Sequence, residues 1–235
     1  MTAASDRYAI YWAPDAAHPL WAAGCRWLGR DPSLPMGMDG LEPPHPDIVA
    51  TPARYGFHAT LKAPIRLAAG TSFADLRQAA AALAGRHRVF DMPALGVAWL
   101  QDFLAVRPLA PLDAAHPLRR LADACVAELD AFRAPAPADE IARRAAQAAD
   151  AASLARIERW GYAHVFDAWR FHMTLSDPFG DPNAEPARRL EHDARAWFSH
   201  SLAQPLRCTA LCIFHEPAGS APLRLVERLP LGGAA

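Results

Sequence analysis

One motif occurs twice in this chain and constrains its fold more than any other feature of the sequence. The two copies are His58-Ala59-Thr60-Leu61 and His172-Met173-Thr174-Leu175, both of the form His-x-Thr-Leu. Each copy lies in a run of aromatic, aliphatic and threonine residues that favours a β-strand. Two matched strands far apart in the chain predict a duplicated architecture, in which the copies occupy equivalent positions.

The elements expected around the two copies follow a similar order. In the first half we expect a strand over residues 7–13, a helix over 18–28, a strand over 55–67, a helix over about 71–84, and a hairpin of residues 89–100 and 103–108. In the second half we expect a helix over about 117–132, a strand over 169–176, a helix over about 185–202, and strands over 206–214 and 223–229. The proline-rich residues 30–52 predict a long loop.

This order predicts an α+β protein rather than a parallel α/β sheet. We expect residues 1–235 to form a single bilobal domain, with pseudo-twofold duplicated strand-helix-strand-strand units and mostly antiparallel sheets that flank a central cleft. The lobe-forming halves are expected at about residues 1–110 and 111–235. An alanine- and arginine-rich helical segment at about 138–162, which ends at Gly161, is expected to be an insertion packed on the body. The sequence leaves open whether this insertion covers the site as a lid.

Composition excludes several classes of function. The 24 basic and 25 acidic residues give a net charge of −1, so the broad positive field typical of nucleic-acid-binding proteins is missing. No apolar run approaches the length of a membrane span, and we expect a cytoplasmic protein without a membrane partner. The cysteines lack the Cys-x-x-Cys spacing of metal or redox sites, so we expect neither metal nor another cofactor: Cys25, Cys125, Cys208 and Cys212.

Strand alternation gives each motif one polar face. Side chains at alternate positions of a strand share a face, which predicts that His58, Thr60 and Lys62 point together. By the same argument Arg170, His172 and Thr174 point together, while the intervening residues face the core. If the two strands meet at one cavity, that cavity holds two imidazoles, two hydroxyls and at least one cation.

Such a set of groups suits cleavage of a phosphodiester. One neutral imidazole can take a proton from water or a hydroxyl, while the other, protonated, gives a proton to the departing alkoxide. Threonine hydroxyls can donate hydrogen bonds to the non-bridging oxygens, and a cation can offset their charge. A single histidine in a strand is usually structural, but two matched motifs among ten histidines are not expected by chance.

The remaining histidines have no matched partner. His215, directly after an expected strand, is a weaker candidate for lining the cleft. The others are expected to be solvated: His18, His45, His87, His116, His164, His192 and His200.

The paired motifs, inside duplicated strand and helix units, resemble the two-histidine (2H) phosphoesterase superfamily. That group includes bacterial RNA 2′,5′-ligase-like proteins and cyclic nucleotide phosphodiesterases. Residues 55–62 and 171–175, with Trp160-Gly161-Tyr162 before the second motif, are most similar to the branch described as phosphonate-metabolism proteins. The likeness covers essentially the whole chain, and its motifs are specific for the superfamily but not for a substrate.

This resemblance implies His58 and His172 as an acid-base pair and Thr60 and Thr174 as phosphate ligands. It also implies a phosphonate-derived cyclic phosphate as substrate, for example a ribosyl cyclic phosphate. Lys62, Arg170 and Tyr55 are added as substrate-binding candidates from strand phase and proximity.

Three interpretations remain open at this point. The first is a metal-independent phosphodiesterase that opens a small cyclic phosphodiester of a sugar or nucleotide. The second is an enzyme that cleaves or joins 2′,5′ linkages in RNA, which the near-neutral charge disfavours. The third is a non-catalytic module that binds a phosphate ligand, for which paired titratable histidines would be unnecessary. The sequence decides neither which histidine is the base nor the oligomeric state.

Overall fold

The computed structural model describes residues 5–35, 37–146, 148–218 and 221–232. Within them a seven-stranded sheet has the order β4-β5-β6-β2-β1-β8-β9, and its strand pairs are antiparallel. Its strands are β1 (Arg7–Trp12), β2 (Ala59–Ile65), β4 (Leu95–Leu100), β5 (Phe103–Pro108), β6 (Met173–Thr174), β8 (Ala210–Glu216) and β9 (Arg224–Pro230). A small second sheet pairs β3 (Phe90–Asp91) with β7 (Arg207–Cys208). The predicted α+β class is confirmed.

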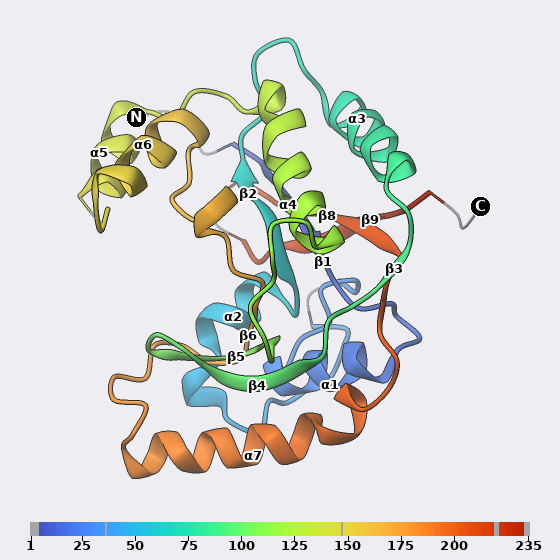
Figure 1. The fold of residues 1–235 in the computed structure, drawn as a ribbon, viewed down its shortest axis with the longest axis vertical. Helices are drawn as coiled ribbons and strands as arrows, with labels where there is room; N and C mark the ends of the chain where they lie inside the picture. Colours follow the sequence, from blue (N-terminus) through green and yellow to red (C-terminus); the bar gives the residue numbers. More distant parts are fainter. Residues whose placement is uncertain (1–4, 36, 147, 219–220, 233–235) are drawn as a thin grey trace.

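Helices cover the sheet in two groups (Figure 1). The first group, α3 (Phe73–Arg86) and α4 (Pro117–Glu128), packs on the β2-β1-β8-β9 side. The second group, α1 (Pro19–Leu28) and α7 (Glu185–Leu202), lies on the β4 side, where α7 packs on β4 and α1 packs on α7. The short helix α2 (Ala50–Tyr55) precedes β2.

The expected helical insertion consists of two helices. These are α5 (Ala138–Ala145) and α6 (Ala151–Trp160), which pack on each other at one corner of the molecule (Figure 1). Helix α6 ends at Gly161, whose φ of 75° is the left-handed conformation that glycine adopts without steric cost. No helix of the described ranges is both long and apolar enough to cross a membrane.

A six-residue repeat that was not among the predicted features precedes one helix in each half of the chain. Residues 15–20 and 113–118 both read Asp-Ala-Ala-His-Pro-Leu, and they connect β1 to α1 and β5 to α4. In each copy the histidine is the N-cap, its Nδ1 accepting a hydrogen bond from a leucine N–H: Leu20 to His18 at 3.1 Å and Leu118 to His116 at 3.2 Å. His18 and His116 are therefore helix caps rather than freely solvated side chains.

The repeat also shows how the two halves of the chain interleave. Strand β1 lies between β2 and β8, but the helix α1 that follows it packs on α7, which itself packs on β4 at the far edge of the sheet. Strand β5 lies beside β6, but the helix α4 that follows it packs on β2. Hydrophobic contacts therefore run between elements far apart in sequence, and one large buried cluster includes residues from both halves. The division at about residue 110 stays a prediction.

Several expected boundaries are wrong for local reasons. The strand expected over 55–67 begins only at Ala59, because residues 50–55 are helical and Gly56 turns the chain with a φ of 79°. The strand expected over 89–100 is interrupted at Met92-Pro93, since proline offers no N–H to a sheet. Of the residues expected to form a strand over 169–176, Met173–Thr174 form strand β6.

Candidate active site

The pairing of β2 with β6 brings the two His-x-Thr-Leu motifs side by side. Ala59 pairs with Met173 in antiparallel register, and both side chains are completely buried. Because neighbours along a strand point to opposite faces, the motif histidines and threonines lie together on the other face. The register sets His58 opposite Thr174 and Thr60 opposite His172. The two histidines are thus diagonal neighbours, with Cβ atoms about 7–8 Å apart or less.

Both imidazoles are held by the same local contact. The Nδ1 atom of His58 lies 2.8 Å from the carbonyl oxygen of Gly56, and Nδ1 of His172 lies 2.8 Å from that of Arg170. A carbonyl oxygen only accepts, so each Nδ1 carries the proton and the Nε2 of a neutral ring has a free lone pair. The hydroxyl of Thr60 lies 3.3 Å from His58 Nε2 and can donate to it. Each ring therefore presents Nε2 as a base.

Aromatic side chains surround His58. The ring of Tyr11 stacks on the imidazole with centroids 3.7 Å apart, and Phe214 lies on another side at 5.8 Å. Burial lowers the pKa of His58 to about 4, the Gly56 carbonyl opposes this shift, and the charge of His172 adds to it. His58 is consequently neutral at physiological pH.

His172 has a more polar environment. Burial lowers its pKa, the Arg170 carbonyl opposes the shift, and positive charge on His164 and Arg107 adds to it. Since Ala105 of β5 pairs with Thr174, the same register sets Arg107 directly opposite His172. A charged His172 lowers the pKa of His58, so binding of a proton by one ring opposes binding of a second proton by the other.

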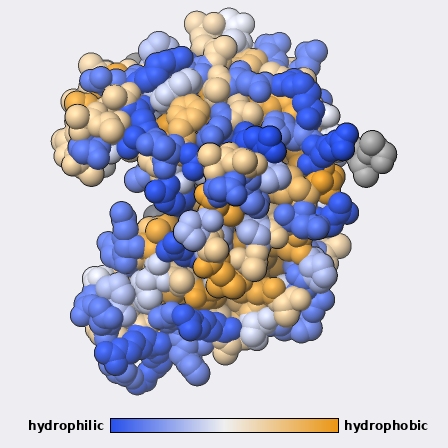
Figure 2. Space-filling view, viewed as in Figure 1, coloured by the Kyte–Doolittle hydropathy of each residue, from blue (hydrophilic) through white to orange (hydrophobic). Residues whose placement is uncertain are grey.

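A cavity of about 190 Å³ opens beside His172 and Thr60. The β4–β5 turn supplies Gln101 to its wall, and the segment after α6 supplies Tyr162 and His164. The indole of Trp169, also on the wall, donates a hydrogen bond of 2.8 Å to the carbonyl of Thr60 and so holds this segment against β2. The molecular surface is indented between the part that carries α5 and α6 and the part that carries β4 and β5 (Figure 2).

Lys62 does not share the face of His58 and Thr60, so this expectation is wrong. Tyr11 pairs with Thr60 whereas Ile10 pairs with Lys62, which leaves Leu61 as an extra residue in β2. This β-bulge interrupts strand alternation and turns Lys62 to the Ile10 face.

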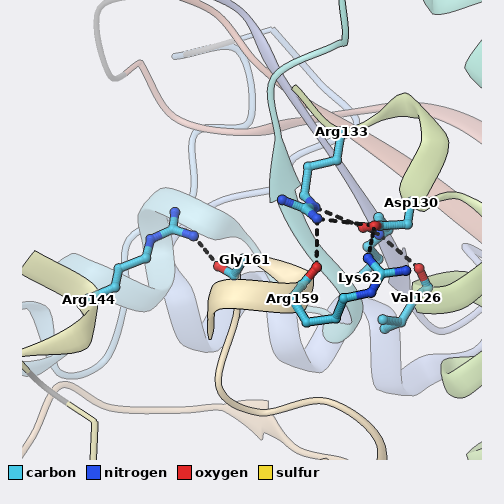
Figure 3. A network of polar contacts seen from close by, with 7 residues as sticks. All are labelled: Lys62, Val126, Asp130, Arg133, Arg144, Arg159 and Gly161. Atoms are coloured by element: carbon cyan, nitrogen blue, oxygen red, sulfur yellow. Dashed lines mark hydrogen bonds and ion pairs between the residues drawn. The ribbon is translucent and has the colours of Figure 1, made fainter. Parts of the chain in front are cut away.

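Beneath α4 the ammonium of Lys62 has two partners. It donates 3.0 Å to the carbonyl of Val126 and lies 3.3 Å from Asp130 (Figure 3). Burial lowers the pKa of Lys62, and Asp130 opposes the shift. The side chain is 5% exposed, which suits a structural role better than contact with a substrate.

The other residues that the sequence suggested for the site differ in how near they lie to His58 and His172. Tyr55 ends α2 with its ring 6.4 Å from that of His58. Arg170 is exposed and lines the cavity beside His172. His215 lies instead on β8, 3.0 Å from Asp6 and stacked on Tyr8, so it is not on the cavity wall. His164, expected to be solvated, is exposed but does line the cavity.

Sequence reasoning missed the residues that neighbouring strands contribute. Tyr11 and Arg107 lie on β1 and β5, whose pairing with the motif strands is not encoded in local patterns. Gln101 has a positive φ of 58°, unusual for a residue other than glycine, asparagine or aspartate. Its place in the two-residue turn between β4 and β5 was predicted, but its contribution to the cavity was not.

The chain belongs to a family described as "Protein of unknown function (DUF1045)", whose model matches residues 60–224. It is also similar to two curated proteins that are each named ribose 1,5-bisphosphate phosphokinase PhnN. The protein from Janthinobacterium sp. (strain Marseille) is 35% identical over 234 residues, which cover 97% of this chain and 51% of the relative. The protein from Laribacter hongkongensis (strain HLHK9) is 38% identical over 227 residues, which cover 93% of this chain and 50% of the relative. The chain thus spans about half the length of these relatives.

Proposed function

We propose that this chain is a phosphodiesterase of the two-histidine type, which opens a small cyclic phosphodiester with His58 and His172 as base and acid. The observation that carries the proposal is the antiparallel pairing of Ala59 with Met173, which sets both histidines and both motif threonines on one face. The matched contacts of both Nδ1 atoms support it, since they aim each Nε2 as a proton acceptor or donor.

In this mechanism His58 Nε2 takes a proton from water, and the water oxygen attacks phosphorus. The bond from phosphorus to one ring oxygen breaks, and protonated His172 gives its proton to that oxygen. The products are a phosphate monoester and a free hydroxyl. Thr60 and Thr174 donate hydrogen bonds to the non-bridging oxygens, whose charge increases in the transition state. The phosphate anion also raises the pKa of His172 and so favours its acid form.

The names of the relatives support a sugar phosphate as substrate. A protein named for ribose 1,5-bisphosphate contains about twice the length of this chain, so the matching half and the remaining half can have different reactions. The sequence of this chain contains no Gly-x-x-x-x-Gly-Lys-Ser/Thr motif, and its single lysine, Lys62, is buried against Asp130. We therefore assign no kinase reaction to this chain and propose that it forms a ribose phosphate by opening a cyclic phosphodiester. The resemblance to phosphonate-metabolism proteins agrees with such a substrate.

The experiment that tests this proposal is an assay of purified protein against ribose 1,2-cyclic phosphate and nucleoside 2′,3′-cyclic phosphates. EDTA is present throughout, and release of the monoester is followed by ³¹P NMR. We expect the sugar substrate to be hydrolysed by the wild type and not by a His58→Ala/His172→Ala double variant. If neither these two classes nor 2′,5′-linked oligoribonucleotides are hydrolysed, the interpretation as a binding module is favoured. Cleavage of 2′,5′-linked oligoribonucleotides in place of both would favour the RNA-directed alternative.

A further inference from the structure

Two guanidinium groups beside the paired histidines have no carboxylate partner among the described residues. Arg107 lies opposite His172 across β5 and β6, and its Nη1 donates 3.0 Å to the carbonyl of Trp99. Arg170 donates from Nη1 to the carbonyls of Asp167 and Trp169 at 2.7 and 2.8 Å. These contacts orient both side chains but leave their charge uncompensated and their remaining N–H groups free to donate.

Both arginines line a second cavity, of about 400 Å³. It adjoins the cavity beside His172 and Thr60, because Trp169 and Arg170 line both. Arg119 of α4 adds a third cation to the wall, partly compensated by Asp123 at 3.3 Å. Asp167 is the one carboxylate that lines the cavity among the described residues, and it extends into solvent with its side chain 82% exposed. The wall therefore carries an excess of positive charge next to the site of the proposed reaction.

A second group of basic residues provides a comparison, because its cations are ion-paired. It lines a cavity of only about 30 Å³ between the insertion and β2. Each of its cations has an acidic partner: Arg7 with Glu216, Lys62 and Arg133 with Asp130, and Arg66 and Arg144 with Glu140. Figure 3 shows Asp130 at the centre of one such network. That group is compensated internally, whereas Arg107 and Arg170 are not.

We propose that Arg107 and Arg170 bind a second phosphate group of the substrate, remote from the phosphodiester that is cleaved. This inference rests on the proposed function and refines it: the substrate is a sugar cyclic phosphodiester that carries a phosphate monoester elsewhere on the sugar. Guanidinium groups suit this role because their planar N–H groups match phosphate oxygens. The near-neutral charge of the whole chain means that such recognition has to be local.

The test compares two probes that differ only in the second phosphate, ribose 1-phosphate and ribose 1,5-bisphosphate. Each is titrated by calorimetry into the wild type and into Arg107→Met and Arg170→Met variants, whose folding is checked by circular dichroism. Arg188→Met, at an exposed position of α7, is the control for loss of one positive charge. Arg170 is itself exposed, so its replacement leaves the core intact.

We expect the wild type and the Arg188→Met variant to bind the bisphosphate about tenfold to a hundredfold more tightly than the monophosphate, the effect of one or two charged hydrogen bonds. In the Arg107→Met and Arg170→Met variants this preference should decrease to within about threefold. Equal binding of both probes by the wild type, or absence of binding of either, would overturn the inference, as would a preference that both variants retain. Hydrolysis of cyclic phosphodiesters is measured separately, so failure of the proposed function is distinguishable from failure of this subsite.

Discussion

Burial of His58 under Tyr11 has a consequence for stability that can be measured without any substrate. The unfolded chain takes up a proton on this ring at the ordinary pKa of 6.5, whereas the folded protein does so only at about 4. The contribution of His58 to the free energy of unfolding is therefore fully present above pH 6.5. It is lost as the pH falls from 6.5 to about 4, because in this range the unfolded state binds the proton and the folded state does not. A tenfold difference in proton affinity between the two states is worth about 1.4 kcal/mol, so the loss from His58 is about 2 kcal/mol at pH 5 and about 3 kcal/mol at pH 4.

A His58→Phe variant isolates this contribution, since phenylalanine can still stack on Tyr11 but does not titrate. Urea unfolding of both proteins at pH 7.5 and pH 5.0 gives the free energy of unfolding for each. Between these pH values the wild type should lose about 2 kcal/mol more than the variant, and contributions from other groups cancel in the difference. Equal losses in the two proteins would mean that His58 has its ordinary pKa in the folded protein. That result would refute the conclusion that burial keeps this imidazole neutral.

Three further outcomes follow from the structure. A Lys62→Met replacement should lower the free energy of unfolding in urea by about 1 to 3 kcal/mol, because it removes a buried charged hydrogen bond, and should leave KM for a cyclic phosphodiester unchanged. A large rise in KM would instead place Lys62 at the substrate. Replacing His18 or His116 by Ala should cost about 0.5 to 2 kcal/mol each, and additively, because each removes a helix cap; a urea series that shows no loss for either would contradict the capping role. The pH profile of kcat/KM should be bell-shaped with an optimum below pH 6.5, since the pKa values of His58 and His172 are both lowered in the free protein; an optimum above pH 7 would argue against the pair.

Local sequence patterns were sufficient for most helices and for the motif faces. The apolar periodicity of residues 18–28 and 185–202 predicts α1 and α7 closely, because each helix buries one stripe along its own length. The faces of His58, Thr60, His172 and Thr174 follow from strand alternation within a few residues on either side of the buried Ala59–Met173 pair. Helix periodicity and strand alternation both depend on residues that are close together in the sequence.

What the sequence did not reveal depends on partners distant in the chain. The bulge at Leu61 results from the pairing of β2 with β1, and it turns Lys62 away from the face that strand phase predicts. Arg107 is near His172 only because β5 pairs with β6. The Asp-Ala-Ala-His-Pro-Leu repeat, by contrast, could have been found by comparing the chain with itself, and it would have indicated that both caps begin equivalent helices.

In the proposed reaction, two histidines on neighbouring strands exchange protons with one phosphodiester. The most direct test of this reaction is the turnover number for ribose 1,2-cyclic phosphate, measured in EDTA for the wild type, His58→Ala, His172→Ala and the double variant. Each single replacement should reduce kcat by about a hundredfold to ten-thousandfold, and the double variant should be little worse than the slower single, because the two groups act as a unit. Single variants that turn over within about threefold of the wild type would contradict the assignment of His58 and His172.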